Sequence, residues 1–177
     1  MKTSIFIDRD GTMGGDSSMP NPWEYKPYKG TEEAFKKLNK AGIPTFIITN
    51  QSCIARGTDN GYDFYKEFKE IGATDAFICC HDDDDNCNCR KPKVGLIQQA
   101  HAKYGMSLPD SYVIGDRWSD MVTGGKMGLK LIIVKTGKGE IALNEERHLW
   151  KDYEPVLIAD NFAQAVDWII LNEQSKL

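Results

Sequence analysis

The stretch Ser4-Ile5-Phe6-Ile7-Asp8-Arg9-Asp10-Gly11-Thr12 decides the fold, because a short apolar run ends abruptly in two carboxylates. The run over 4–7 does not alternate polar and apolar residues, which is typical of a parallel strand covered by helices on both faces. Ligands of such sheets bind beyond the carboxyl ends of the strands. Asp8 and Asp10 therefore mark a candidate active site, and Gly11 allows the backbone to turn sharply after them.

The two acids at this strand end also predict a cation. Carboxylates held close together repel each other unless a cation lies between them or one of them keeps its proton. Mg²⁺ fits, because it takes oxygen ligands from one or two carboxylates and keeps positions for water and phosphate. Taken alone, the motif has a second interpretation as a solvated turn after an edge strand, since Asp and Gly are common turn residues.

Length and composition predict a soluble globular protein with a single domain over 1–177. The hydrophobic content of 41% and the charged content of 27% are ordinary for that class. A net charge of −4 argues against a nucleic-acid or membrane-surface partner. The expected partner is a small molecule, and the expected state is a monomer.

Localisation is expected to be cytoplasmic. No apolar run approaches the length of a membrane span, and Met1-Lys2-Thr3 followed by a short strand is not a signal peptide. Four of the five cysteines crowd between Cys79 and Cys89, which predicts reduced thiols or metal ligands rather than a disulfide framework.

The rest of the chain alternates apolar strands with helices. Residues 13–29 hold three prolines and predict a loop that can reach the site. We expect strands over 45–48, 76–78, 112–114, 131–134 and 156–158, and helices over 31–41, 62–71, 92–104 and 161–171, with a further short helix carrying Asp120. Thr31 is the expected cap of the first helix, and Pro92 the expected first residue of the third. This alternation predicts an α/β fold with a doubly wound parallel sheet, and neither 10–30 nor 50–91 is long enough for a cap domain.

Successive strands end in chemically useful side chains. Asp8 and Asp10 follow the first strand, Thr49 and Asn50 the second, and Asp116 the fourth. Parallel strands bring these ends to one edge of the sheet. Lys91 follows the cysteine cluster and precedes a helix, which makes it the natural cation for the same site. Acids for Mg²⁺, a hydroxyl and an amide for phosphate oxygens, and a lysine for their charge are typical of phosphoryl transfer.

Four motifs resemble those of haloacid dehalogenase (HAD) superfamily phosphatases, in the same order. They are FIDRDGT at 6–12, TNQS at 49–52, RKP at 90–92 and GDRWSD at 115–120. TNQSCIARG and the C-x-H…C-x-C-R-K-P arrangement resemble more closely the zinc-containing heptose bisphosphate phosphatases and the related histidinol-phosphate phosphatases. The resemblance implies a Rossmann-like HAD fold with a zinc-binding loop.

The resemblance also implies roles for individual residues. Asp8 would be the nucleophile that forms a phosphoaspartyl intermediate, and Asp10 the acid that protonates the leaving group and later activates water. Mg²⁺ would bind Asp8, Asp116 and the backbone carbonyl of Asp10, and Asp120 would orient Lys91 or the metal shell. Thr49 and Lys91 would stabilise the transferring phosphoryl group. Substrate contacts are expected from Asp16, Asn50, Gln51, Ser52, Arg90 and Arg117.

The cysteine cluster predicts a separate, structural zinc site. Cys79-x-His81 and Cys87-x-Cys89 each place two soft ligands on one side of an extended segment, and the five residues between the pairs suffice to fold them round a tetrahedral ion. Cys80 would replace Cys79 if the backbone shifted, although alternation and the family pattern favour Cys79. The alternative is a set of free thiols beside a solvated turn. In either case the acidic run over 82–85 is predicted to be a solvated turn rather than a set of ligands, as a run of like charges usually is.

The predicted function is that of a Mg²⁺-dependent phosphatase of carbohydrate metabolism, acting on a small sugar phosphate or bisphosphate such as heptose 1,7-bisphosphate. Histidinol phosphate and nucleotides remain open as substrates, since Cys53 and the loop over 13–16 depart from the family pattern. Two other classes also stay open: a catalytically silent zinc-stabilised binding module, and a thiol sensor using Cys53 and Cys80. The complete catalytic set and the ligand spacing of the cysteines disfavour them.

Overall fold

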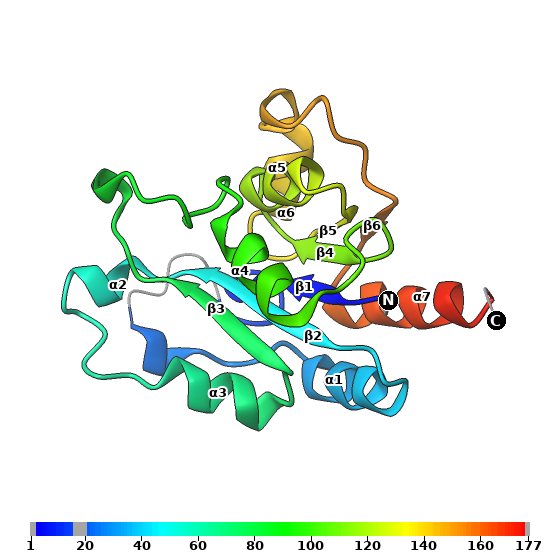
Figure 1. The fold of residues 1–177 in the computed structure, drawn as a ribbon, viewed down its shortest axis with the longest axis horizontal. Coiled ribbons are helices and arrows are strands. Elements are labelled where there is room, and N and C mark those ends of the chain that lie inside the picture. Colours follow the sequence, from blue (N-terminus) through cyan, green and yellow to red (C-terminus); the bar gives the residue numbers. More distant parts are fainter. Residues whose placement is uncertain (1–2, 16–20, 176–177) are drawn as a thin grey trace.

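The computed structural model describes residues 3–15 and 21–175. Its centre is one six-stranded sheet with the order β3-β2-β1-β4-β5-β6, in which every neighbouring pair is parallel (Figure 1). The strands are β1 Ile5–Ile7, β2 Thr45–Asn50, β3 Asp75–Cys79, β4 Tyr112–Gly115, β5 Lys130–Val134 and β6 Leu157–Ala159. The predicted α/β fold with a doubly wound parallel sheet is confirmed.

Helices cover both faces of the sheet and bury its apolar strands. They are α1 Thr31–Lys40, α2 Ser52–Ala55, α3 Phe64–Ile71, α4 Gly95–Tyr104, α5 Trp118–Lys126, α6 Gly139–Asn144 and α7 Phe162–Gln174. Ile5 and Ile7 pack with the apolar faces of α1, α3 and α7, whereas Phe6 packs with those of α4 and α5. This alternation explains why β1 reads as a continuous apolar run, since each of its side chains is buried in one of two cores.

Two helix starts differ from the prediction. Thr31 is the first residue of α1 rather than its cap, and its hydroxyl donates to the carbonyl of Met13 at 2.8 Å. That bond fastens the helix to the segment that follows the two acids. α3 begins at Phe64 rather than at 62, because the Asp63 side chain accepts from the Lys66 amide at 3.0 Å and caps the helix there.

The prediction that Pro92 opens a helix is wrong. α4 begins at Gly95, and the Lys91–Pro92 peptide bond is cis. The residues between Pro92 and Gly95 instead form turns with the segment that carries Cys87 and Cys89. The Lys93 amide donates to the Arg90 carbonyl at 2.8 Å, and the Gly95 amide donates to the Asn88 carbonyl at 3.2 Å. These are turn hydrogen bonds, so the helical ladder starts only after them.

Short elements escaped prediction because they carry little periodicity. They are α2, α6 and three 3-10 helices, η1 Pro22–Glu24, η2 Asp83–Asp85 and η3 Arg147–Leu149. In the part of the chain that the structure describes, no helix has both the length and the apolar character needed to cross a membrane.

Candidate active site

The candidate site lies where the strand order reverses, between β1 and β4. Strands β2 and β3 extend the sheet on one side of this point, and β5 and β6 on the other (Figure 1). Asp8 directly follows β1 and Asp116 directly follows β4, whose residues pair in register. In open α/β sheets the crevice at such a point is the ordinary position of a ligand. The predicted convergence of the strand ends is therefore present in the fold.

Lys91 joins two of the acids. Its ammonium donates to Asp8 Oδ1 at 2.6 Å, to Asp120 Oδ1 at 2.7 Å and to the Ile48 carbonyl at 2.9 Å. All three side chains are buried. Burial by itself lowers the pKa of Lys91, but Asp120 and Asp8 outweigh it, so the pKa of the lysine is raised. The ammonium therefore stays charged and holds both carboxylates in place.

Asp116 faces Asp8 from the neighbouring strand. The Thr12 hydroxyl lies 3.2 Å from Asp8 Oδ2 and 3.3 Å from Asp116 Oδ1, so these two oxygens are close neighbours. Burial, then the charges of Asp8 and Asp120, raise the pKa of Asp116 well above its usual value. Ligand oxygens of the three acids all lie within 4.8 Å of one another.

The charge of this group fits a divalent cation. Three buried carboxylates face one lysine, which leaves an excess of negative charge in a region of low polarity, where uncompensated charge is strongly unfavourable. Hard oxygen ligands of this kind suit Mg²⁺. The side chain that faces Asp8 in this group is that of Asp116, as the family resemblance implies, and the Asp10 carboxylate lies outside the group.

The segment after β5 positions Asp116, and the sequence analysis missed it. The Lys138 amide donates to Asp116 Oδ2 at 2.7 Å, and the Thr136 hydroxyl donates to the Gly11 carbonyl at 2.7 Å. A Cβ atom on Gly11 or on Gly137 would overlap Asp116 Oδ2, and both glycines have positive φ. The two glycines in Thr136-Gly137-Lys138-Gly139 after a strand were the available signal.

The Asp10 carboxylate is turned away from the cluster formed by Asp8, Asp116 and Asp120. Arg9 Nη1 donates to Asp10 Oδ1 at 2.6 Å, and Gln51 Nε2 donates to Asp10 Oδ2 at 2.8 Å and to Thr49 Oγ1 at 2.9 Å. Burial raises the pKa of the Asp10 carboxyl, although Arg9 opposes that shift. A raised pKa suits a group that donates a proton in acid catalysis.

Two further polar residues, at the end of β2 and just after it, bind other site residues. Asn50 Nδ2 donates to the Lys91 carbonyl at 3.3 Å, and its Oδ1 accepts from the Lys91 amide at 3.1 Å. Ser52 Oγ accepts from Arg90 Nη1 at 2.9 Å. Asn50 and Ser52, predicted as substrate contacts, are thus engaged by the loop that carries Lys91.

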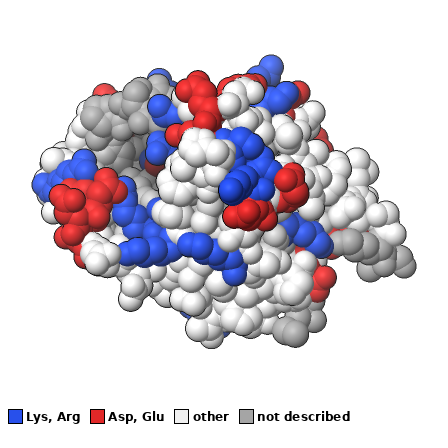
Figure 2. Space-filling view, turned by 90° about the horizontal axis from the view of Figure 1, so that it is seen from above, with Lys and Arg blue, Asp and Glu red and all other residues white. Residues whose placement is uncertain are grey.

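A basic pocket of about 300 Å³ opens in front of these groups. Its lining includes the acids Asp8 and Asp10 and the cations Arg9, Arg56, Arg90, Lys91 and Arg117. Figure 2 shows Lys and Arg side chains gathered beside a hollow on this face, with a group of acidic side chains next to them. Asp16, the remaining predicted substrate contact, lies outside the described residues.

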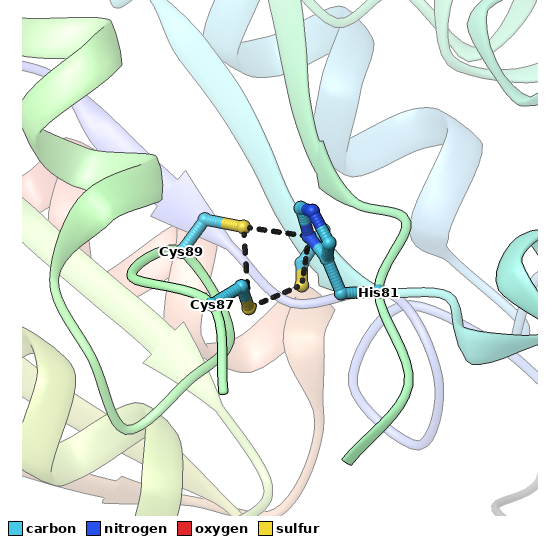
Figure 3. A group of neighbouring side chains, drawn as sticks. His81, Cys87 and Cys89 are labelled. Carbon is cyan, nitrogen blue, oxygen red and sulfur yellow. Dashed lines mark hydrogen bonds between the residues drawn. The ribbon is translucent and has the colours of Figure 1, made fainter. Parts of the chain in front are cut away.

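The second predicted cluster is also assembled. Sγ of Cys79 lies 3.6 Å from Sγ of Cys87 and 3.7 Å from Nδ1 of His81, while Sγ of Cys89 lies 3.6 Å from Cys87 and 3.3 Å from His81 (Figure 3). A tetrahedral zinc ion with bonds of about 2.3 Å to sulfur and about 2.0 Å to nitrogen implies separations of roughly 3.8 Å between two sulfurs and roughly 3.5 Å between sulfur and nitrogen. The four atoms therefore fit zinc, and the exposed Cys80 lies outside the group.

The loop between the two ligand pairs carries charges toward the pocket. Asp83, in η2, pairs with Arg90 Nε at 2.5 Å, and Asp82 binds the guanidinium of Arg56 at 2.6 and 2.5 Å. Arg56 in turn follows α2. The segment 82–85, predicted as a solvated turn, is thus a capped 3-10 helix that holds two pocket arginines.

Comparison with known proteins agrees with this geometry. Residues 88–165 match the family model described as HAD-hydrolase-like. The D-glycero-beta-D-manno-heptose-1,7-bisphosphate 7-phosphatase of Helicobacter pylori strain J99 is 32% identical over 177 residues, covering 94% of this chain and 96% of that protein. The protein of the same name from Neisseria meningitidis serogroup A is 30% identical over 155 residues, covering 81% and 83%.

A solved structure is similar over nearly the whole chain. The D,D-heptose 1,7-bisphosphate phosphatase from B. bronchiseptica, crystallised with magnesium and phosphate, superposes with a TM-score of 0.81 at 25% identity, covering 97% of this chain and 99% of that one. The motif resemblance is thereby confirmed. The chain belongs to the HAD-like phosphatases, in the family of the D-glycero-D-manno-heptose-1,7-bisphosphate 7-phosphatases.

Proposed function

We propose that this phosphatase hydrolyses a sugar bisphosphate, with heptose 1,7-bisphosphate as the first candidate, through a phosphoaspartyl intermediate on Asp8. The observation that carries the proposal is the buried arrangement in which Lys91 binds Asp8 on one side while Asp116 faces it on the other. The names of the relatives described above support the substrate. We expect the enzyme to act as a cytoplasmic monomer with one domain.

The proposed reaction has two steps. Asp8 attacks phosphorus, the bond from phosphorus to the leaving oxygen breaks, and the proton of Asp10 goes to that oxygen. Asp10, now ionised, takes a proton from a water molecule, which attacks the phosphoaspartate and releases inorganic phosphate. Asp8 is thereby regenerated. Lys91 and the Thr49 hydroxyl stabilise the negative charge on the phosphoryl oxygens.

Two metals complete the proposal. Asp8, Asp116 and the backbone carbonyl of Asp10 would hold Mg²⁺, which when bound neutralises phosphoryl charge as a Lewis acid. The Cys79, His81, Cys87 and Cys89 cluster would hold zinc with all four positions closed, which is typical of a structural site. The zinc loop would then present Arg90 to the part of the substrate remote from the reacting phosphate.

The test is phosphate release from heptose 1,7-bisphosphate, histidinol phosphate and nucleoside monophosphates, with and without Mg²⁺. We expect Mg²⁺-dependent turnover that is fastest on the sugar bisphosphate, and none with folded Asp8→Asn. Preference for histidinol phosphate or a nucleotide would overturn the substrate. Turnover that survives in Asp8→Asn would overturn the nucleophile.

A further inference from the structure

Arg9, which lies between the two acids in the sequence, is bound from several directions. Its Nε and Nη2 donate to Oε1 and Oε2 of Glu67 at 2.8 and 2.7 Å, and Nη1 donates to Asp10 Oδ1 at 2.6 Å. Nη2 also donates to the Pro22 carbonyl at 3.2 Å. The Arg9 side chain is only 3% exposed. The two hydrogen bonds to Glu67 are bidentate, which is the geometry that fixes the plane of a guanidinium most firmly.

Two aromatic rings near the Arg9 guanidinium, and a further hydrogen bond to its partner Glu67, also hold this group in place. The Tyr25 ring lies 3.9 Å from the guanidinium carbon, and the Phe64 ring lies 5.3 Å from it. Glu67, in α3, also accepts from the Tyr62 hydroxyl at 2.7 Å. Arg9 is therefore held by two segments other than its own, and its position does not depend on the catalytic strand alone.

The fixed position of Arg9 also determines the orientation of the Asp10 carboxyl group. Among the described residues, Arg9 donates to Asp10 Oδ1 and Gln51 donates to Oδ2, so these two side chains fix the rotation of the carboxyl group. A general acid must lie within hydrogen-bond reach of the leaving oxygen, and small errors of placement lower the rate steeply.

We propose that Arg9 and Glu67 form a positioning pair that orients the Asp10 carboxyl toward the leaving group. The inference rests on the proposed function, since it assigns residues to the proton transfer of that reaction. Glu67 fixes Arg9, and Arg9 fixes Asp10. Neither residue needs to contact the substrate, and the link connects helix α3 to the catalytic step.

The choice of substrate provides a readout that a loss of folding would not give. The alkoxide of a sugar is a poor leaving group and needs a proton, whereas p-nitrophenolate leaves without one. The parameter kcat/KM covers only the steps up to formation of the phosphoenzyme. A misplaced Asp10 therefore lowers kcat/KM for the sugar bisphosphate much more than for p-nitrophenyl phosphate.

The test compares Glu67→Gln with Asp75→Asn. These are matched, because Asp75 also binds one cation and one tyrosine hydroxyl, those of Lys103 and Tyr104, both at 2.8 Å. We expect Glu67→Gln to lower kcat/KM for the sugar bisphosphate about tenfold or more, since the full effect of a general acid is of order 10²–10⁴, with less than about threefold loss on p-nitrophenyl phosphate. Asp75→Asn should change neither.

Equal losses on both substrates, or no loss, would overturn the positioning role. If Glu67→Gln does not fold, Arg9→Lys keeps the charge but loses the planar fork, and the same ratio is measured. Asp10→Asn is the reference for a complete loss of the acid. Failure of the proposed function is distinguishable, because the unsubstituted protein would then lack Mg²⁺-dependent turnover on the sugar bisphosphate.

Discussion

Lys91 and Asp8, which are 83 positions apart in the chain, form a buried ion pair of 2.6 Å at the centre of the site. A buried pair of this kind is a weak source of stability, because both ions lose their hydration. Its position between the end of β1 and the loop before α4 fits the catalytic roles proposed for both residues. The same ammonium binds Asp120, so one side chain fixes two acids.

Replacement of this lysine gives the first prediction. Lys91→Met should destabilise the protein by about 3–5 kcal/mol, because it leaves buried carboxylates without their counter-ion. Turnover should be lost as well. The double variant Lys91→Met/Asp120→Asn should recover part of the stability, measured by urea unfolding, but none of the turnover. Recovered turnover in the double variant would show that Lys91 serves only to neutralise Asp120.

The second prediction separates the roles of the two acids in the first motif. Asp10→Asn should lower turnover of the sugar bisphosphate about 10²–10⁴-fold, since the amide cannot donate the required proton. With an activated aryl phosphate, the first step should survive and the phosphoenzyme should accumulate, because the amide also cannot activate water. Rapid-quench labelling detects it. A folded Asp10→Asn that forms no phosphoenzyme would contradict the assigned role.

The third prediction concerns the glycine that packs against Asp116. Gly137→Ala should raise the Mg²⁺ concentration for half-maximal activity about 10–100-fold, the usual effect of disturbing a residue that orients a metal ligand. Gly128 is the matched control, because it too has positive φ, +73° against +58°, while no described atom lies within 4 Å of its Cβ position. Gly128→Ala should lose stability but keep its Mg²⁺ dependence. Equal behaviour of the two variants would count against the contact with Asp116.

What the sequence predicts well and what it misses have different physical origins. The strands were predicted because a strand that is buried on both faces needs a continuous apolar run, such as Ile5-Phe6-Ile7, and such a run is visible in the local sequence. Their polar ends then converge by topology alone, which brings Asp8, Thr49 and Asp116 together. The amide of Lys138 on Asp116 is a backbone contact across 22 positions, which only the neighbouring glycines hint at, because a backbone amide has no residue-specific signal of its own.

The Arg9–Glu67 pair was missed for a related reason. The two residues are 58 positions apart, and their contact depends on how α3 is placed against the sheet. Helical periodicity places Glu67 on a surface turn but does not say which strand end that turn faces. The direction of the Asp10 carboxylate follows from the same contact, and the spacing of Asp8 and Asp10 in the sequence does not predict it.

The fourth prediction is that the zinc site is structural. Cys87→Ser/Cys89→Ser should lose one zinc ion per chain with a lower melting temperature, because metal-binding energy contributes to folding. Cys80→Ser is the control, since that thiol is exposed and outside the cluster, and it should keep both the zinc and the melting temperature. Zinc analysis by mass spectrometry checks both variants. Loss of activity on zinc removal without any change in stability would argue against a structural site.

The last prediction links the zinc loop to selectivity. Arg90 lines the pocket and is held by Asp83 and Ser52, so its guanidinium is placed before substrate arrives. A second anionic group of the substrate would gain from a guanidinium that is already oriented.

Arg90→Ala should therefore lower kcat/KM for the sugar bisphosphate about tenfold or more while leaving p-nitrophenyl phosphate nearly unchanged, because only the bisphosphate uses binding energy remote from the reacting phosphorus. Arg147→Ala is a suitable control, since this arginine binds Glu154 and the backbone near η3 instead. This loss resembles the one expected for Glu67→Gln, but the two differ in their dependence on the remote phosphate. A sugar monophosphate without that group should be insensitive to Arg90→Ala and still sensitive to Glu67→Gln. Equal losses on the monophosphate and the bisphosphate in Arg90→Ala would place this arginine at the reacting phosphoryl group itself.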